Sequence, residues 1–258
     1  MKLWKELKKA LLELEKWNNK IIINKIKNII FKKLKIKKRK KSDCMKKMFL
    51  TSSFGYVEKL FKNFLENDLG LENNLKGKTV ALIPTAALVE NIDIHIKIAM
   101  EIYESLGMSI TLLELTEVSE TKAKDLINDS DILHISGGNT FFLMQEIQKK
   151  NLSDFIVKKV ENGLIYVGES AGSAIMSPDI EYVSECDDKA FAPELKNTKG
   201  LNLLPFYPVP HYQSEPYKES CDRLVQKYKD KLHLVPFNNI QAITVEDDDY
   251  NLVTLQKI

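Results

Sequence analysis

The chain has 258 residues, of which 44% are hydrophobic and 29% are charged, so it is long enough to bury the core of one large domain. Its three cysteines, Cys44, Cys186 and Cys221, are odd in number and widely spaced. This argues against a disulfide framework and a paired-cysteine zinc site, and it favours a reducing, cytoplasmic location. The formal net charge is only +2, but eighteen of the 38 Lys/Arg residues and four of the 36 Asp/Glu residues fall in residues 1–47, so a basic segment precedes an acidic body.

The basic segment differs in kind from the rest, and we divide the chain into an extension at 1–44 and a domain at 45–258. Leucine, isoleucine and tryptophan recur among the lysines of the extension with roughly helical spacing. Such a segment suits an anionic membrane surface or nucleic acid, but its lysines are too frequent for a membrane span and it shows no secretory signal. We favour the simpler interpretation of a solvated appendage, and we expect the domain itself to bind no nucleic acid.

From residue 49 the domain alternates short apolar runs with amphipathic segments. Strands are predicted at 49–53, 79–84, 109–113, 131–136 and 164–167, and helices at 56–66, 92–106, 122–127, 141–148 and 153–161. A helix at 215–229 and strands at 234–237, 242–245 and 250–255 follow, with an acidic turn at 247–249 that we interpret as a solvated hairpin tip. This order predicts an α/β fold with a parallel sheet between layers of helices, in which sites gather beyond the carboxyl ends of the strands.

A Gly-x-Ser-x-Gly turn, Gly168-Glu169-Ser170-Ala171-Gly172, joins the apolar run at 164–167 to a helical start at 171–176. A strand, a tight turn and a helix in this order hold a serine hydroxyl exposed at the end of a parallel sheet. The five-residue motif is common by chance, and the flanking pattern is what favours Ser170 as a nucleophile.

The loop Gly137-Gly138-Asn139-Thr140 follows another predicted strand and lies at the same edge of the sheet as Ser170. Acyl transfer needs N–H donors at the oxygen that becomes negative, and the amides of Ala171 and Gly138 are the candidates. Asn139 or Thr140 is also suited to cap the helix that follows, which is compatible with an exposed amide. Phosphate binding here is less favoured, because no phosphate-loop pattern follows.

A serine nucleophile needs a base, and the chain has four histidines, at 95, 134, 211 and 233. His211 is preferred because it follows an apolar run ending in prolines and comes after the serine in the chain. Chain order alone does not choose the accompanying carboxylate. The candidates between the two residues are Asp179, Glu181, Glu185, Asp187, Asp188 and Glu194.

Five segments, taken together and in order, resemble peptidase family S51, the group of dipeptidase E and, more distantly, of cyanophycinase. The resemblance runs from about Met45 to the C-terminus. The segments are Thr51-Ser52-Ser53-Phe54, Ile83-Pro84-Thr85-Ala86, Gly137-Gly138-Asn139-Thr140-Phe141-Phe142-Leu143, Gly168-Glu169-Ser170-Ala171-Gly172-Ser173 and Pro210-His211-Tyr212.

The resemblance implies a three-layer, flavodoxin-like sandwich similar to the class I glutamine amidotransferases. It also implies a serine peptidase that cuts short peptides through an acyl-enzyme, without metal or cofactor. The implied residues are Ser170 as nucleophile, His211 as base, the Gly138 and Ala171 amides as oxyanion donors, Asn139 beside the substrate, and Asp187 as the acid, with Glu185 and Asp188 as alternatives.

Dipeptidases of this family cut after an N-terminal aspartate, which requires a cationic group near the pocket. Arg223 is the only arginine of the domain and falls on the predicted helix at 215–229, so the preference for aspartate does not follow from this sequence. Two other functions share the same features. One is an esterase or amidase using the same triad, and the other is a binding protein that kept the fold and lost turnover.

Deletion of residues 1–44 is expected to leave hydrolytic turnover intact, because every segment quoted above begins at or after Thr51. The test compares kcat and KM of the full and shortened chains on one substrate, with circular dichroism to verify folding. A clear loss of turnover in the folded, shortened chain would refute the division at residue 44.

Overall fold

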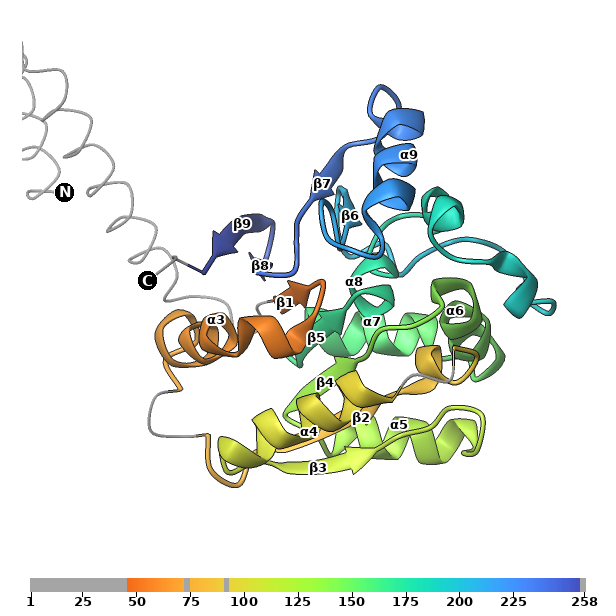
Figure 1. Cartoon of the computed structure of the whole chain (residues 1–258). Helices are drawn as coiled ribbons and strands as arrows, with labels where there is room; N and C mark the ends of the chain where they lie inside the picture. The colour runs from red at the N-terminus through yellow and green to blue at the C-terminus, as the bar shows by residue number, and fades with distance from the viewer. Residues whose placement is uncertain (1–45, 72–74, 91–92, 256–258) are drawn as a thin grey trace, which may run out of the picture. The chain divides into compact units, whose positions relative to one another are not determined.

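The computed structural model describes residues 46–71, 75–90 and 93–255 (Figure 1), and the predicted extension at 1–44 lies outside them. In this described part of the chain, no helix is both long enough and apolar enough to cross a membrane. The elements alternate between strands and helices along most of the domain, as the sequence predicts.

The centre of the domain is a seven-stranded sheet in the order β3-β2-β4-β5-β1-β8-β9. Five neighbouring strands are parallel, and β8 and β9 extend one edge in antiparallel pairing. A second sheet has two parallel strands, β6 and β7. The strands are β1 (Lys47–Thr51), β2 (Thr79–Ile83), β3 (Ser109–Leu112), β4 (Ile132–Ile135), β5 (Ile165–Glu169), β6 (Tyr207–Val209), β7 (Leu234–Pro236), β8 (Gln241–Glu246) and β9 (Asp249–Thr254).

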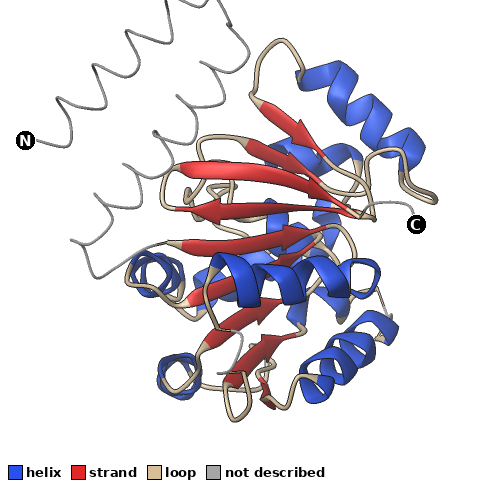
Figure 2. Cartoon of the chain, turned by 90° about the vertical axis from the view of Figure 1, so that its left-hand side faces the viewer, coloured by secondary structure: helices blue, strands red, loops and turns tan. Residues whose placement is uncertain are grey.

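Helices cover both faces of the large sheet, as Figure 2 shows. One face packs on η1 (Phe54–Val57), α3 (Glu58–Asn63), η2 (Phe64–Asp68) and α4 (Ile94–Ser105). The other packs on α5 (Glu120–Asn128), α6 (Thr140–Lys149), α7 (Ser153–Glu161) and α8 (Ala171–Ala174). Helix α9 (Lys218–Tyr228) lies beside β6 and β7 in Figure 1. Short turns of helix are η3 (Thr85–Ala87), η4 (Glu181–Glu185) and η5 (Lys189–Phe191). The predicted three-layer α/β fold is therefore confirmed.

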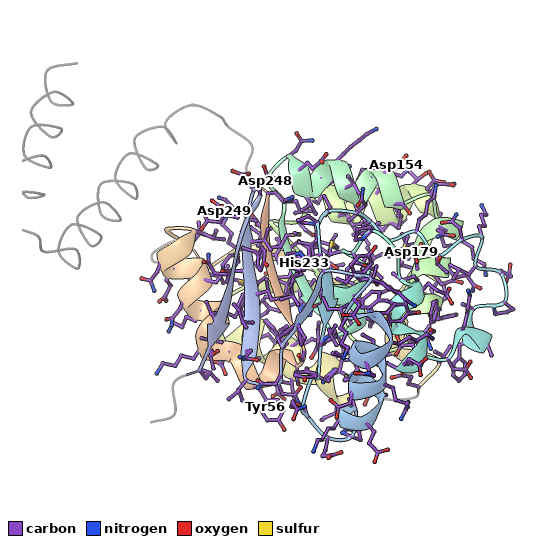
Figure 3. The ribbon with its side chains drawn as sticks, turned by 90° about the horizontal axis from the view of Figure 1, so that it is seen from above. Tyr56, Asp154, Asp179, His233, Asp248 and Asp249 are labelled. Carbon is purple, nitrogen blue, oxygen red and sulfur yellow. The ribbon has the colours of Figure 1, made fainter. Side chains whose placement is uncertain are left out.

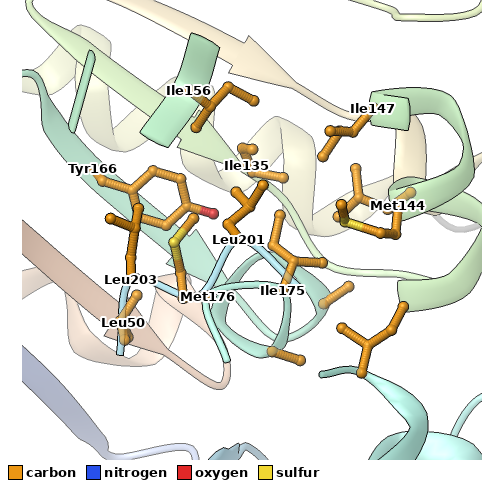
Figure 4. Close-up of a cluster of buried hydrophobic side chains, with 14 of the residues drawn as sticks. Leu50, Ile135, Met144, Ile147, Ile156, Tyr166, Ile175, Met176, Leu201 and Leu203 are labelled. Carbon is orange, nitrogen blue, oxygen red and sulfur yellow. The ribbon is translucent and has the colours of Figure 1, made fainter. Parts of the chain in front are cut away.

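Alternate residues of the central strands belong to the two hydrophobic cores on opposite faces of the large sheet. Leu133 and Ile135 of β4 face one core and Ile132 faces the other, and all three are fully buried. This explains why the central strands read as continuous apolar runs, since each face must be covered. Burying each such side chain contributes about 1.5–3 kcal/mol. Figure 4 shows part of one core, where the Tyr166 hydroxyl reaches the Gly172 carbonyl at 2.6 Å and so ties the sheet to α8.

The predicted acidic turn joins β8 to β9 as a hairpin. Asp248 and Asp249 lie at its tip in Figure 3. Asp247 has φ 55°, and its Oδ1 accepts a hydrogen bond from the backbone N–H of Lys46 at 3.0 Å. The turn therefore also fixes the start of β1.

A buried polar group, Glu169, ends β5 directly before Ser170. Its Oε1 accepts the Phe54 N–H at 2.8 Å, and its Oε2 has no hydrogen-bond partner among the described residues. Burial raises the pKa of Glu169 from its ordinary 4.5 to about 7. His134 on β4 is buried too, with Nδ1 3.1 Å from the Tyr103 hydroxyl, and burial lowers its pKa to about 3.

Replacing Glu169 by glutamine should remove a pH-dependent loss of stability. Between about pH 4.5 and 7 the folded carboxyl group keeps its proton while the unfolded one loses it, so the wild-type fold loses stability as the pH rises through this window. The free energy of unfolding of E169Q, minus that of wild type, should therefore increase by up to about 3 kcal/mol across the window. Urea denaturation at several pH values measures it, and a difference independent of pH would contradict the assignment.

Candidate active site

Ser170 occupies the turn between β5 and α8 at the carboxyl edge of the sheet. Its backbone has φ 47° and ψ −105°, a conformation that residues other than glycine rarely adopt. The Ser170 N–H donates to the Thr51 carbonyl at 2.9 Å, and Ser173 Oγ accepts the Thr51 N–H at 3.1 Å. Gly172 permits close packing behind the turn, because a Cβ there would lie 2.1 Å from the Ile135 carbonyl oxygen. Strand β1 and the small residues of α8 therefore hold the serine in place.

His211 follows β6 and brings its imidazole to the serine. Its Nε2 lies 3.1 Å from Ser170 Oγ. The residue has φ 59°, its N–H donates to Ser52 Oγ at 2.9 Å, and its ring lies 4.6 Å from the ring of Tyr217. Burial lowers the pKa of His211, so the imidazole is neutral at neutral pH and can accept a proton. The sequence-predicted pair of nucleophile and base is therefore brought together.

Asn239, in the loop between β7 and β8, is the second partner of the imidazole. Its Oδ1 lies 2.8 Å from His211 Nδ1. An amide oxygen can only accept a hydrogen bond, so Nδ1 carries the proton and Nε2 faces the Ser170 hydroxyl as an acceptor. Asn239 thus fixes the tautomer that a base requires, without supplying a negative charge.

The carboxylates considered in the sequence analysis contact groups other than His211. The contacts are Asp187 Oδ2 with the Thr140 N–H at 2.8 Å, Glu185 Oε1 with Lys227 Nζ at 2.7 Å, and Asp188 Oδ1 with the Ala190 N–H at 2.8 Å. Here the structure differs from the expected triad, because residues 181–191 run past the start of α6 and along α9 rather than behind the imidazole. Of these three carboxylates only Asp187 lines the cleft of Ser170, and its part in turnover stays a prediction.

Asn239 was missed because only carboxylates between the serine and the histidine were considered. Nothing in the local sequence around 238–239 marks an amide as a partner of an imidazole 28 positions away. The contact exists because the loop after β7 returns beneath β6, where the Tyr212 N–H donates to the Phe237 carbonyl at 3.1 Å.

Two backbone amides beside Ser170 are available for an oxyanion. Gly138 has φ 129°, and a Cβ there would lie 2.2 Å from the Ala86 carbonyl oxygen, so only glycine fits. Gly138 and Ala171 both line the cleft with Ser170, and neither N–H has an acceptor among the described residues. Free N–H groups at this position suit an oxygen that becomes negative during acyl transfer.

Asn139 is almost fully buried, and its side chain is occupied within the fold. Its Oδ1 accepts the Phe142 N–H and its Nδ2 donates to the Asp188 carbonyl, both at 2.9 Å. Asn139 therefore caps α6 and ties the glycine loop to the segment that carries Asp187. This arrangement favours the capping role that the sequence analysis allowed, rather than direct contact with substrate.

His95 lines an adjoining part of the cleft, where its Nε2 lies 3.3 Å from the Gly137 carbonyl. Burial lowers its pKa, as it does for His211. His95 is one of the four histidines of the sequence, where His211 was preferred as the base. Across the described ranges, no three His, Cys, Asp or Glu side chains form a group that could hold a metal ion.

Comparison with known proteins places the chain among peptidases. The family model described as peptidase family S51 matches residues 48–253. An uncharacterized peptidase of Listeria monocytogenes is 37% identical over 201 residues, covering 78% of this chain and 95% of the relative. A peptidase E of Haemophilus influenzae is 32% identical over 174 residues, covering 66% of this chain and 75% of the relative.

Solved structures show the same likeness. A crystal structure of a candidate peptidase E from Listeria monocytogenes has a TM-score of 0.76 and 35% identity, covering 82% of this chain and all of that one. A peptidase from an acI-B1 actinobacterium has a TM-score of 0.63 at 18% identity, covering 82% of this chain and 88% of that one, and so shares the fold.

Changes at Asn239 should move the pH dependence of turnover. Its hydrogen bond raises the pKa of His211, so N239A should lower that pKa and N239D, which adds a negative charge, should raise it. The acid limb of the pH profile of kcat/KM is expected to shift to lower pH in N239A and to higher pH in N239D. N239A should also lose about 10²-fold in kcat, because the imidazole ring is no longer held in its orientation.

The comparison variant is E185Q, since Glu185 pairs with Lys227 away from the imidazole. It should leave both kcat and the acid limb unchanged. If E185Q shifts the limb and the Asn239 variants do not, the assignment of the imidazole's partner is wrong.

Proposed function

The chain belongs to peptidase family S51, and on that premise we propose that it is a serine-type exopeptidase acting on short peptides. One observation carries the proposal. A neutral imidazole nitrogen of His211 lies 3.1 Å from the hydroxyl of Ser170, at a cleft that two unpaired amides also line. A base, a nucleophile and donors for an oxyanion are the three parts that acyl transfer requires.

In the first half of the reaction the substrate carbonyl sits against the amides of Gly138 and Ala171. Ser170 Oγ attacks the carbonyl carbon, and its proton passes to His211 Nε2. The resulting oxyanion is stabilised by the two N–H groups. His211 then gives the proton to the leaving nitrogen, the C–N bond breaks, and an amine departs while the acyl group stays on Ser170.

In the second half a water molecule replaces the amine. His211 takes a proton from the water as its oxygen attacks the ester carbonyl. The same two amides hold the second oxyanion. The ester bond breaks, the proton returns to Ser170 Oγ, and the carboxylic acid product leaves. Asn239 keeps Nδ1–H in place through both halves, so Nε2 always faces the reacting atoms.

The cleft favours small substrates without a requirement for N-terminal aspartate. Arg223 is the one arginine of the domain, and it does not line the cleft. It lies on α9, where its Nε is 3.7 Å from Glu185 Oε2. No lysine or arginine among the described residues lines it either, so an aspartate side chain would meet no cation there. We therefore include peptides with neutral N-terminal residues among the substrates.

The nucleophile is tested with a fluorophosphonate probe, which reacts with activated serines. Wild type should be labelled and S170A should not, because the probe must form a bond to Ser170 Oγ. S109A is the matched control, since Ser109 is an exposed serine on the edge strand β3, and it should label like wild type. Labelling of S170A at the wild-type rate would refute the assignment.

Turnover is then measured on a panel of dipeptides and on p-nitrophenyl esters. S170A and H211A should lose at least about 10³-fold in kcat, and H233A, at an exposed histidine, should lose little. Cleavage of dipeptides supports the peptidase. Hydrolysis of the esters alone would make the protein an esterase on the same fold.

A further inference from the structure

Two carboxylates share the cleft of Ser170 and have no cationic partner there. Glu90 and Asp187 line it together with Ser170 and His211, and no described lysine or arginine does so. Neither carboxylate forms an ion pair with another described residue. Burying an unpaired carboxylate is costly, so a positively charged group from outside the chain would be stabilised beside this pair.

Asp187 forms the inner part of this acidic pair. Its Oδ2 accepts the Thr140 N–H at 2.8 Å, at the first turn of α6. Although the helix start favours a negative charge, loss of water dominates and raises the pKa of the Asp187 carboxyl. The carboxyl group is therefore anchored on one side and faces the cleft on the other.

Glu90 forms the outer part, in the turn that follows η3. Its backbone N–H donates to the Ala87 carbonyl at 3.1 Å, which fixes the main chain. Its carboxylate is half-buried and has no hydrogen bond to a described residue. Burial and, to a smaller extent, repulsion from Asp187 raise the pKa of Glu90, so the two charges lie close enough to affect each other.

We propose that Glu90 and Asp187 bind the free α-ammonium group of the peptide substrate and thereby make the enzyme specific for an unblocked amino terminus. This rests on the proposed function. In an N-terminal residue the ammonium nitrogen is two bonds from the carbonyl carbon that Ser170 attacks, so it must lie beside the nucleophile. Two carboxylates in the same cleft match that position and that charge.

The part of the cleft that Glu90 and Asp187 share favours the α-ammonium over a long basic side chain. Its volume is about 50 Å³, which is roughly the room that three or four water molecules occupy by this measure. A compact ammonium group with its Cα fits such a space. An adjoining hollow of about 120 Å³ is also lined by Glu90 and Ser170, but Asp187 does not line it.

The test compares three p-nitroanilides on wild type, E90Q and the control E117Q, whose glutamate is exposed and outside the cleft. The acyl groups are alanyl, propionyl, which lacks only the amino group, and Nα-acetyl-lysyl, which has its cation on the side chain. Wild type should prefer the alanyl substrate. E90Q should lower kcat/KM for it by about tenfold or more, mainly through KM, and leave the propionyl substrate unchanged. E117Q should match wild type on all three.

Three results would overturn the proposal. The first is an equal kcat/KM of wild type for the alanyl and propionyl substrates. The second is an equal loss of kcat/KM on both substrates in E90Q. The third is a loss in E90Q on the Nα-acetyl-lysyl substrate alone, which would place a side-chain cation in the cleft. Binding is read separately from turnover, because alaninamide should slow fluorophosphonate labelling of Ser170 in wild type more than propionamide does, and this difference should vanish in E90Q.

Failure of the proposed function would give results that differ from failure of the ammonium site. If wild type is not labelled at all, the nucleophile assignment fails. The acidic pair is then tested by thermal unfolding, in which alaninamide should raise the midpoint of wild type and propionamide should not. Equal midpoints with the two amides would overturn the ammonium site by itself.

Discussion

The backbone conformation of Ser170 is the constraint on which the site depends. A residue with a side chain at φ 47° costs about 1–3 kcal/mol unless its surroundings enforce it. Here β1 enforces it from one side, since Thr51 pairs with Glu169 in the sheet and binds the turn beyond it. Gly172 enforces it from the other, because only glycine lets α8 approach β4. The packing of β1 and α8 therefore offsets the strain at Ser170 and keeps its hydroxyl at the edge of the sheet.

The imidazole beside this serine is oriented by an amide rather than by a carboxylate. Asn239 selects the tautomer of His211 but does not compensate the positive charge that forms when the ring takes a proton. The face of Tyr217, 4.6 Å from the imidazole, is one group that favours that charge. The carboxyl groups that share the cleft with Ser170 are instead those of Glu90 and Asp187.

Separate parts of the domain converge on this cleft. The turn with Glu90 comes from the loop after β2, the two amides from the loops after β4 and β5, and the imidazole from the end of β6. Parallel strands place their carboxyl ends at one edge, which explains why the first three meet. The imidazole arrives through the small β6–β7 sheet, whose geometry also carries Asn239.

The sequence alone determined much of the fold and part of the site. Apolar runs covered on both faces predict the central strands, and the Gly-x-Ser-x-Gly turn and the glycines before α6 predict Ser170 and the Gly138 amide, because each depends on a local pattern of a few residues. The order of motifs also pointed to His211. What only the tertiary structure decided are contacts between distant segments. Asn239 lies beside the imidazole, Glu90 shares a cleft with Asp187, and the side-chain amide of Asn139 donates to the Asp188 carbonyl. None of these contacts has a local signature, since each depends on how loops return across the edge of the sheet.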